Sequence, residues 1–255
     1  MILYHRVGRI AYITLNRPEK GNVINTEMAG QLIKAWIEFR DDDEAWVAIL
    51  RGNGNTFCGG YDFKEIERKH GNWKPADSVI FGTNRVSPNF YDVSKPIIGA
   101  LHGYIPGAGM YLALECDIKI AAEGTSFALP EPRFNLPTSF ASLITKHMLR
   151  SHALYLMLTG SRLTTKQAYE MGIINEIASQ EILMERAEEI AYQICKLGPM
   201  SVRAIKTAFY KGQNLDYEQL VSIMEELFPP IMNSEDVLEG RDSFFEKREP
   251  VWKLK

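Results

Sequence analysis

The amino-acid sequence predicts an α/β fold, and two observations lead to that prediction. Short apolar runs rich in β-forming residues, at 10–15, 45–51, 96–101 and 118–121, alternate with stretches of helical periodicity. Strands that alternate with helices are typical of the α/β class. The 255-residue chain is also 45% hydrophobic and 24% charged, which provides a full core and excludes a disordered chain.

The first quarter of the chain contains three predicted strands and one helix. Residues 1–16 read as two short strands, and a turn signal follows at 16–21. The continuous apolar run at 45–51 predicts a buried strand, and a glycine-rich loop and a charged helix starting at Phe63 come after it. Residues 26–40 are predicted to form an amphipathic helix, because apolar residues recur at helical spacing (Met28, Leu32, Ile33, Trp36 and Phe39).

A second round of the same pattern follows. It runs through a strand, a glycine loop, a helix and another strand, at 96–101, 102–107, 108–114 and 118–121, with a β-like piece at 126–129. From about residue 142 the pattern is helical, with a turn at 161–163 and a break at Pro229-Pro230. We therefore expect a core over residues 1–198 and a smaller C-terminal helical region over 199–255.

Composition excludes several classes of protein. Lys and Arg number 29 and Asp and Glu 32, for a net charge of −3, so neither nucleic acid nor a membrane surface is an expected partner. The three cysteines lie far apart without a CxxC pair, which excludes a disulfide scaffold and fits a reducing, cytoplasmic compartment. The uncharged stretch 96–114 contains prolines and glycines that favour a buried strand and helix over a membrane span. His147 and His152 have no convincing third ligand, so no metal is expected.

Two glycine-rich loops are the first candidates for chemistry. The loop at 51–64 has Phe57 where a dinucleotide fingerprint needs its third glycine, and it lacks the Gly-Lys-Ser/Thr of a P-loop. The second loop, Gly107-Ala108-Gly109, follows a buried strand and opens a helix. Two such strand-to-helix junctions can aim two backbone N–H groups at one oxygen, as an oxyanion hole does. On spacing alone, ordinary turns explain the pattern more often.

Motifs along nearly the whole chain add a resemblance. They are Asn16-Arg17-Pro18, 57–62, 95–104 with 107–109, Cys116-Asp117, Leu129-Pro130-Glu131, 158–160, 171–176 and the C-terminal run 239–252. In this collinear order the sequence resembles the crotonase superfamily, the enoyl-CoA hydratase/isomerase family. Chance agreement of so many motifs is very improbable.

The resemblance implies a fold, a substrate and a set of roles. The fold is a spiral of repeated β-β-α units with a C-terminal helical region that helps to assemble homotrimers or hexamers. The substrate is an acyl-CoA thioester, so coenzyme A belongs to the substrate and no separate cofactor is expected. The backbone N–H groups of Tyr61 and Ala108 match the family's oxyanion hole. The segment Tyr61, Asp62, Phe63 and Lys64 matches the wall of the CoA channel.

Two lysines match positions that can face the CoA phosphates. Lys64 is the stronger candidate and Lys20 the weaker, and a solvated surface charge explains either lysine equally well.

The sequence departs from the hydratase pattern at one of two glutamates. Glu131 is retained, whereas Tyr111 stands at the first glutamate position. A phenol with a pKa of about 10 is a poor base at neutral pH, so a pocket-wall role for Tyr111 is favoured over catalysis. A helix cap or ion pair is the alternative for Glu131. Three further apolar residues, Met110, Phe134 and Phe140, are either a wall of the acyl pocket or ordinary core.

The leading hypothesis is proton transfer at Cα of an acyl-CoA through an enolate held in the oxyanion hole, with Glu131 as the base. One carboxylate suffices to move a double bond, whereas water addition divides its work between two. Isomerisation is therefore slightly favoured over hydration. The alternatives are an acyl-CoA hydrolase or decarboxylase of the same superfamily, or a non-catalytic acyl-CoA-binding oligomer.

Overall fold

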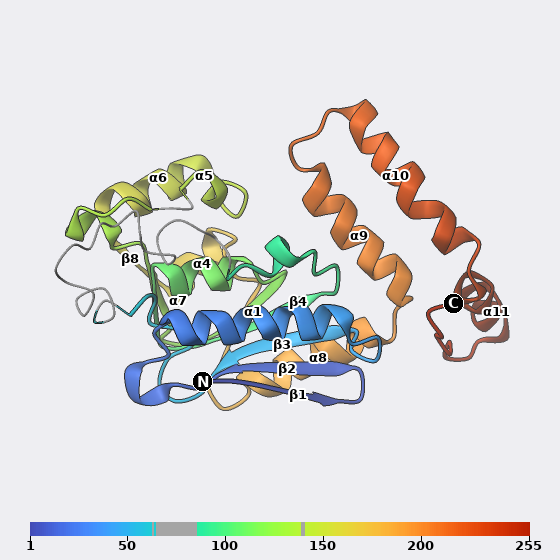
Figure 1. Ribbon diagram of the computed structural model, residues 1–255, viewed down its shortest axis with the longest axis horizontal. Helices are drawn as coiled ribbons and strands as arrows, with labels where there is room; N and C mark the ends of the chain where they lie inside the picture. The colour runs from blue at the N-terminus through green and yellow to red at the C-terminus, as the bar shows by residue number, and fades with distance from the viewer. Residues whose placement is uncertain (63, 65–85, 139–140) are drawn as a thin grey trace.

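The computed structural model describes residues 1–62, 64, 86–138 and 141–255. A mixed six-stranded sheet forms its centre, in the order β1-β2-β3-β4-β6-β9 (Figure 1). The strands β1 and β2 pair antiparallel, and every later pair in this sheet is parallel. The bounds are Ile2–Val7 for β1, Ile10–Leu15 for β2, Val47–Gly52 for β3, Ile97–Leu101 for β4, Ile118–Ala122 for β6 and Glu176–Ala178 for β9.

Helices cover both faces of the main sheet, which is why its strands read as continuous apolar runs. Alternate residues of a strand point to opposite faces, so Ile13 packs on the side of α1 (Thr26–Asp41) and Ile10 on the side of α8 (Leu183–Cys195). The predicted amphipathic helix at 26–40 is thus confirmed. The Asn25 side chain caps its start by accepting a hydrogen bond from the backbone of Met28 at 2.8 Å.

A second, three-stranded sheet has the order β5-β7-β8, with bounds Tyr104–Pro106, Ser126–Ala128 and Arg162–Thr164. The sequence pattern predicted only the middle strand. It was wrong at 161–163, where β8 replaces the expected turn, and it missed β5 and β9. Strands of three residues are too short to show alternation, and they are set by pairing with distant residues such as Tyr104 with Ser126.

The other predicted strands are confirmed with shifts of one or two residues at their ends, and the helix α4 has the predicted bounds, Ala108–Leu114. The charged helix expected from Phe63 lies outside the described residues. None of the described helices is long and apolar enough to cross a membrane. The remaining elements are η1 (Pro18–Lys20), η3 (Pro88–Tyr91), η4 (Glu131–Phe134), α5 (Ala141–Ile144), α6 (Arg150–Thr159) and α7 (Thr165–Glu170).

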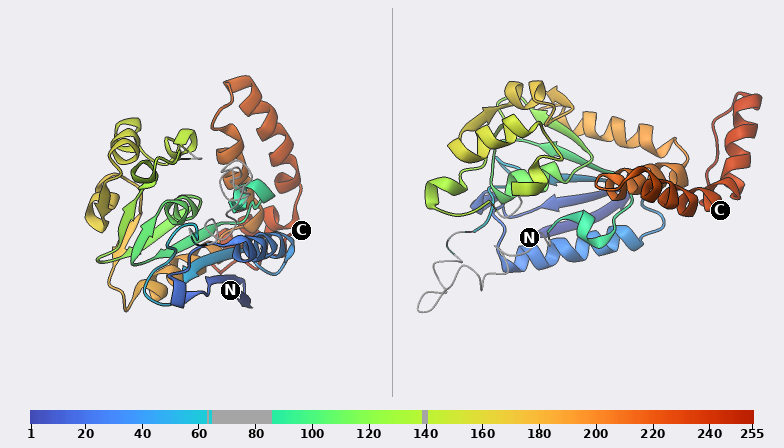
Figure 2. Two further views of the ribbon diagram at one scale, coloured as in Figure 1. Left: turned by 60° about the vertical axis from the view of Figure 1, so that its left-hand side comes forward. Right: turned by 90° about the horizontal axis from the view of Figure 1, so that it is seen from above.

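The C-terminal helices are α9 (Pro199–Gly212), α10 (Tyr217–Met232) and α11 (Glu235–Glu246). Figures 1 and 2 show α10 beside α9 and α11 at the far end, away from the main sheet. Buried ionic contacts fix α9 on the core. The Lys206 ammonium lies 2.7 Å from the carboxylate of Asp117 and also donates to the Lys95 carbonyl, and the Tyr210 hydroxyl donates to Asp117 at 2.9 Å.

The predicted break at Pro229-Pro230 is wrong, because α10 continues through both prolines. They lie in its last turn, on an exposed stretch, where water can solvate the carbonyls that lose their N–H donors. The Pro229 carbonyl still accepts a hydrogen bond from the Asn233 N–H at 3.0 Å.

Candidate active site

The two glycine loops meet at one edge of the main sheet. The neighbouring strands β3 and β4 are parallel, so the chain leaves both at the same edge. A Cβ on Gly109 would collide with the Cys58 carbonyl oxygen, and a Cβ on Gly60 would lie 3.0 Å from the Pro106 oxygen and 3.8 Å from the Ala108 nitrogen. Only glycines allow backbones to approach so closely, and this contact brings Tyr61 beside the start of α4.

Both predicted oxyanion donors have a defined backbone setting. Ala108 is the first residue of α4, after Gly107 in a positive-φ conformation (φ 52°), so its N–H has no partner within the helix. Among the described residues it donates no hydrogen bond. Tyr61 forms a parallel bridge with Ile24, in which the Ile24 N–H donates to the Gly60 oxygen and the Asp62 N–H to the Ile24 oxygen. In that pattern the N–H of Tyr61 faces away from Ile24.

Glu131 joins this centre from the second sheet. Because β5 pairs with β7, the Gly107 N–H donates to the Ala128 oxygen at 2.9 Å, and η4 begins at Glu131 just beyond. A Cβ on Gly107 would lie only 2.8 Å from Glu131 Oε1. Glu131 Oε2 is shielded from solvent and makes no hydrogen bond with the described residues. Glu131 therefore forms no ion pair with the described residues, in contrast to that alternative.

Burial governs the protonation of this centre. It raises the pKa of Glu131, against a smaller opposing effect of the residue's own backbone N–H. The Tyr61 side chain is half-buried, and burial, followed by the electrostatic influence of Cys58 and Glu131, raises the pKa of its phenol to about 12. The fold thus brings together Tyr61, Ala108 and Glu131, which are far apart in the sequence.

The other predicted CoA-channel residues have different surroundings. The Asp62 carboxylate pairs with the Arg17 guanidinium at 2.7 Å and accepts the backbone N–H of Lys64 at 3.1 Å, so it holds its own loop in place. Lys20 and Lys64 are exposed. Lys20 sits in η1, next to the loop of Tyr61, because the Gly59 N–H donates to the Gly21 oxygen at 2.9 Å. Phe63 lies outside the described residues.

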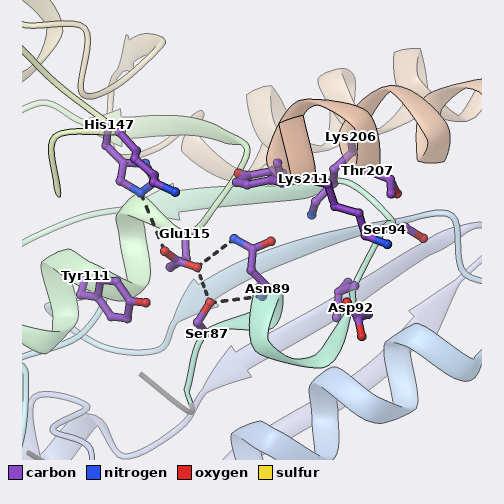
Figure 3. A pocket seen from close by; sticks show the side chains of 13 residues that line it. Ser87, Asn89, Asp92, Ser94, Tyr111, Glu115, His147, Lys206, Thr207 and Lys211 are labelled. Carbon is purple, nitrogen blue, oxygen red and sulfur yellow. Dashed lines mark hydrogen bonds and ion pairs between the residues drawn. The ribbon is translucent and has the colours of Figure 1, made fainter. Parts of the chain in front are cut away.

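A cavity of about 560 Å³ opens beside α4, and Tyr111 is one of the residues that line it (Figure 3). Tyr61, Ala108 and Glu131 do not line this cavity. Tyr111 lines it and follows Ala108 by about one helical turn. Tyr111 therefore connects the cavity with the start of α4. The other lining residues are Ser87, Asn89, Asp92, Val93, Ser94, Glu115, Lys146, His147, Lys206, Thr207, Tyr210 and Lys211.

The expected apolar wall is not found at the described residues. Met110 is fully buried in the core, and Phe134 is 58% exposed and outside the cavity lining. Phe140 lies outside the described residues. The side of the cavity near α4 instead combines the Tyr111 ring with polar groups of Ser87, Asn89 and Glu115.

Glu115 is the residue in this cavity that the sequence reasoning missed. It is only 5% exposed. Its Oε2 accepts hydrogen bonds from the Ser87 hydroxyl and, at 2.9 Å, from the Asn89 amide, while Oε1 lies 3.8 Å from His147 Nε2 (Figure 3). The Tyr111 phenol lies near Ser87 and Glu115, and burial followed by the charge of Glu115 raises its pKa. The sequence contained one indication of its position. Glu115 follows Tyr111 by four residues, and this spacing places both side chains on one face of α4.

Protonation in the cavity is set by burial as well. Burial raises the pKa of Glu115, while hydrogen bonds from Ser87, Asn89 and Tyr111 act in the opposite direction. Burial, and then the charges of Lys119 and Lys146, lowers the pKa of His147 to about 4. The His147 ring is therefore neutral at pH 7, and its approach to Glu115 is not an ion pair there. Across the described residues, no group of three or more His, Cys, Asp or Glu side chains could hold a metal ion.

The interlocked glycine loops, the carboxylate beside them and the α/β core have the arrangement that the sequence resemblance implies, that of a crotonase-fold protein. Residues 6–255 match the family model described as enoyl-CoA hydratase/isomerase, and the chain belongs to this family. A carnitinyl-CoA dehydratase of Salmonella typhimurium strain LT2 is 35% identical over 257 residues, covering 97% of this chain and 96% of the relative.

Two solved structures are similar over the full chain. An enoyl-CoA hydratase/isomerase from Mycobacterium paratuberculosis is 32% identical with a TM-score of 0.88, over 100% of this chain and 98% of its own. An enoyl-CoA hydratase from Bacillus anthracis is 28% identical with a TM-score of 0.90, over 100% of this chain and 99% of its own. These likenesses confirm the fold that the resemblance implied.

Proposed function

We propose that Glu131 transfers a proton at Cα of an acyl-CoA while the N–H groups of Tyr61 and Ala108 hold the thioester oxygen. The observation that carries the proposal is the position of Glu131. Its carboxylate lies against Gly107, where α4 begins, and Oε2 has no partner among the described residues. A buried carboxylate oxygen without a partner is costly to the fold, and a base needs such a free lone pair.

Removal of the Cα proton places negative charge on the thioester oxygen as an enolate forms. Two backbone N–H donors stabilise that charge, and the start of a helix adds a favourable dipole. The raised pKa of Glu131 suits a base that works near neutral pH, because proton transfer is most efficient when the pKa approaches the working pH.

Double-bond isomerisation is the slightly favoured form of this chemistry. Only Glu131 supplies a carboxylate beside the start of α4 among the described residues, since Tyr111 replaces the other and Glu115 is held by Ser87 and Asn89. One base returns the proton to a different carbon of the same substrate. Addition or elimination of water is the second candidate, because the relative at 35% identity is named a dehydratase.

The two forms are separated by following the absorbance of the conjugated thioester. We expect a 3-enoyl-CoA to gain this absorbance faster than crotonyl-CoA loses it by hydration. Efficient hydration of crotonyl-CoA without isomerisation would refute the favoured form. Binding of acyl-CoA with neither reaction would support the hydrolase, decarboxylase or non-catalytic alternatives.

We also propose a homotrimer or hexamer built through residues 199–255. Large apolar side chains on these helices are exposed in the single chain: Ile205 by 66%, Phe209 by 63%, Phe244 by 77% and Phe245 by 74%. Exposed apolar surface of this kind is typical of a subunit interface. Light scattering that shows a monomer at micromolar concentration would contradict the proposal.

Lys20 and Lys64 are proposed to face the CoA phosphates, and their exposure next to the Tyr61 loop supports this. The double variant Lys20→Ala/Lys64→Ala should bind free CoA more weakly, with a smaller dependence on salt. Unchanged affinity and salt dependence would leave both lysines as solvated surface charges.

A further inference from the structure

The Tyr61 backbone belongs to a short segment, residues 59–62, that pairs with residues 21–24 through a single bridge. Three backbone hydrogen bonds join the two segments, at 2.7, 2.9 and 3.0 Å. A pairing of this length is marginally stable by itself in water. The position of the Tyr61 N–H therefore depends on the other contacts that hold these two segments together.

The two proposed oxyanion donors differ in this support. Ala108 begins α4, whose seven residues are all buried, so the packing of the helix fixes its N–H. Tyr61 lies in a loop, and the chain is already exposed at Lys64. Loss of support at the loop would therefore move one donor away from an oxygen that both donors must reach.

The Arg17 guanidinium ties the two paired segments together. Its Nη1 donates to the Val23 carbonyl at 3.1 Å in one segment and to the Asp62 carboxylate at 2.7 Å in the other. Asp62 directly follows Tyr61 in the chain. The side chains of Arg17 and Asp62 are only 16% and 13% exposed. An ion pair with so little exposure is screened less than a surface pair, and removal of one partner leaves the other charge uncompensated.

Arg17 is itself held by the turn that contains it. Its backbone N–H donates to Asn22 Oδ1 at 2.8 Å, and its carbonyl accepts the Asn22 N–H at 3.0 Å. Asn22 is fully buried, and its Nδ2 donates to the carbonyls of Asn53 at 2.8 Å and Thr56 at 2.7 Å. The guanidinium therefore reaches Asp62 from a turn that is bound to the first glycine loop.

We propose that Arg17 is a positioning residue, which holds the Tyr61 N–H on the thioester oxygen through its ion pair with Asp62. This deepens the proposed function, because it rests on Tyr61 as an oxyanion donor. Such a donor acts only where the negative charge develops, and a displacement of about 1 Å can cost about 10²-fold in rate. Without the ion pair the N–H of Tyr61 loses this alignment, whereas Ala108 keeps its own.

Steady-state kinetics on Arg17→Gln and Asp62→Asn test the ion pair, with whichever reaction the wild type catalyses. We expect kcat to fall roughly tenfold to hundredfold in each variant, as a misplaced donor implies. Affinity of Arg17→Gln for free CoA, measured by calorimetry, should stay within about twofold of the wild type, because free CoA has no thioester oxygen. An unchanged kcat in folded Arg17→Gln overturns the proposal, and so does a loss confined to the binding of free CoA.

A double variant tests whether the two side chains act through one contact. Arg17→Gln/Asp62→Asn should lose no more than about twofold beyond either single variant. Arg17→Lys retains a cation beside Asp62 and should recover part of the lost kcat. Losses that multiply in the double variant overturn the role of the pair. Circular dichroism checks each fold, and Asp62→Asn carries the test if Arg17→Gln does not fold.

Arg186→Gln is the matched control for the loss of an ion pair as such. The Arg186 guanidinium lies 2.7 Å from the Glu176 carboxylate and joins α8 to β9. This distance equals the one between Arg17 and Asp62, but neither residue of the control pair belongs to the glycine loops. The control variant should therefore keep the kcat of the wild type.

The infrared carbonyl stretch of bound hexanoyl-CoA gives a readout that a loss of stability alone does not move. Hydrogen bonds to the thioester oxygen lower its frequency, and this saturated compound has no double bond to shift or hydrate. We expect a higher frequency in Arg17→Gln than in the wild type, and the wild-type frequency in Arg186→Gln. Equal frequencies in Arg17→Gln and the wild type overturn the proposal.

Failure of this inference can be told apart from failure of the proposed function. Glu131→Gln should keep the wild-type frequency, because a saturated thioester uses the donors and not the base. Equal frequencies in the wild type and Ala108→Pro would remove the proposed oxyanion hole, and the role of Arg17 with it. A difference between those two proteins, with Arg17→Gln equal to the wild type, removes the role of Arg17 alone.

Discussion

Two carboxylates, the half-buried Glu131 and the buried Glu115, stand at the two ends of α4, and their surroundings are opposite. Glu131 lies against Gly107 at the start of the helix, with one oxygen that has no partner among the described residues. Glu115 stands at the other end of α4, and its carboxylate accepts hydrogen bonds from Ser87 and Asn89. The helix dipole favours a negative charge at the start and opposes one at the end, so Glu115 needs its donors and Glu131 does not.

The comparison shows that hydrogen-bond donors give two similar carboxylates different properties. Burial raises the pKa of both carboxyls. Donors from Ser87 and Asn89 fix the position of the Glu115 carboxylate. Glu131 Oε2 has no hydrogen-bond partner among the described residues, which suits the acid–base role proposed for it.

The largest expected effect is on turnover when the free carboxylate is removed. Glu131→Gln keeps the shape and loses the proton acceptor, so we expect kcat to fall by about 10²–10⁴-fold with little change in acyl-CoA affinity. Glu115→Gln leaves the proposed base in place, so its effect on kcat should be much smaller. Steady-state kinetics on both variants measure the contrast, with Glu123→Gln as control because Glu123 is exposed and outside the cavity. Activity of Glu131→Gln within a few-fold of the wild type would remove it from the mechanism.

The next effect concerns the backbone at the start of α4. Ala108→Pro deletes one proposed donor, and loss of an oxyanion donor costs on the order of 10²–10³ in rate. Proline is well tolerated at the first position of a helix, and Gly107 before it has no Cβ to clash, so the fold should persist by circular dichroism. Ala108→Gly retains the N–H and should keep most of the activity. A folded Ala108→Pro protein with normal turnover contradicts the assignment of the donor.

The sequence predicted the long elements of this fold well and the short ones poorly. The strands β2, β3 and β4 and the helix α4 are largely apolar runs, so local pattern decides them. By contrast β5, β8 and β9 depend on pairing with distant residues, and α10 tolerates two prolines because they fall in an exposed last turn.

The residues of the candidate site also differ in how well the sequence predicted them. Spacing alone left the glycine loops open between turns and an oxyanion hole, and the family resemblance was needed to select Tyr61, Ala108 and Glu131. The four-residue spacing from Tyr111 was the one signal for Glu115, and it did not reveal the partners Ser87 and Asn89, which lie 28 and 26 residues away. Contacts of that range become visible only in the folded chain.

The smallest expected effects are on the free energy of unfolding, and they test the same comparison of Glu131 with Glu115. The folded-state pKa of Glu131 is raised by burial, so the stability it contributes is present below its ordinary pKa and is lost as pH rises through the folded-state value. Glutamine has no carboxyl group to ionise, so Glu131→Gln removes this loss of stability at higher pH. We expect the variant to be more stable than the wild type by about 1 kcal/mol at pH 8, with a smaller difference at pH 4.

Glu115→Leu should act in the opposite direction. The pKa of Glu115 is raised too, but its removal leaves the buried Ser87 hydroxyl and the Asn89 amide without their acceptor, at a cost of about 2 kcal/mol that persists at both pH values. Urea unfolding at one fixed protein concentration measures both variants, because subunit association also contributes to stability. A destabilised Glu131→Gln together with an unaffected Glu115→Leu would reverse the comparison, and would mean that Glu131 is the carboxylate held by the fold.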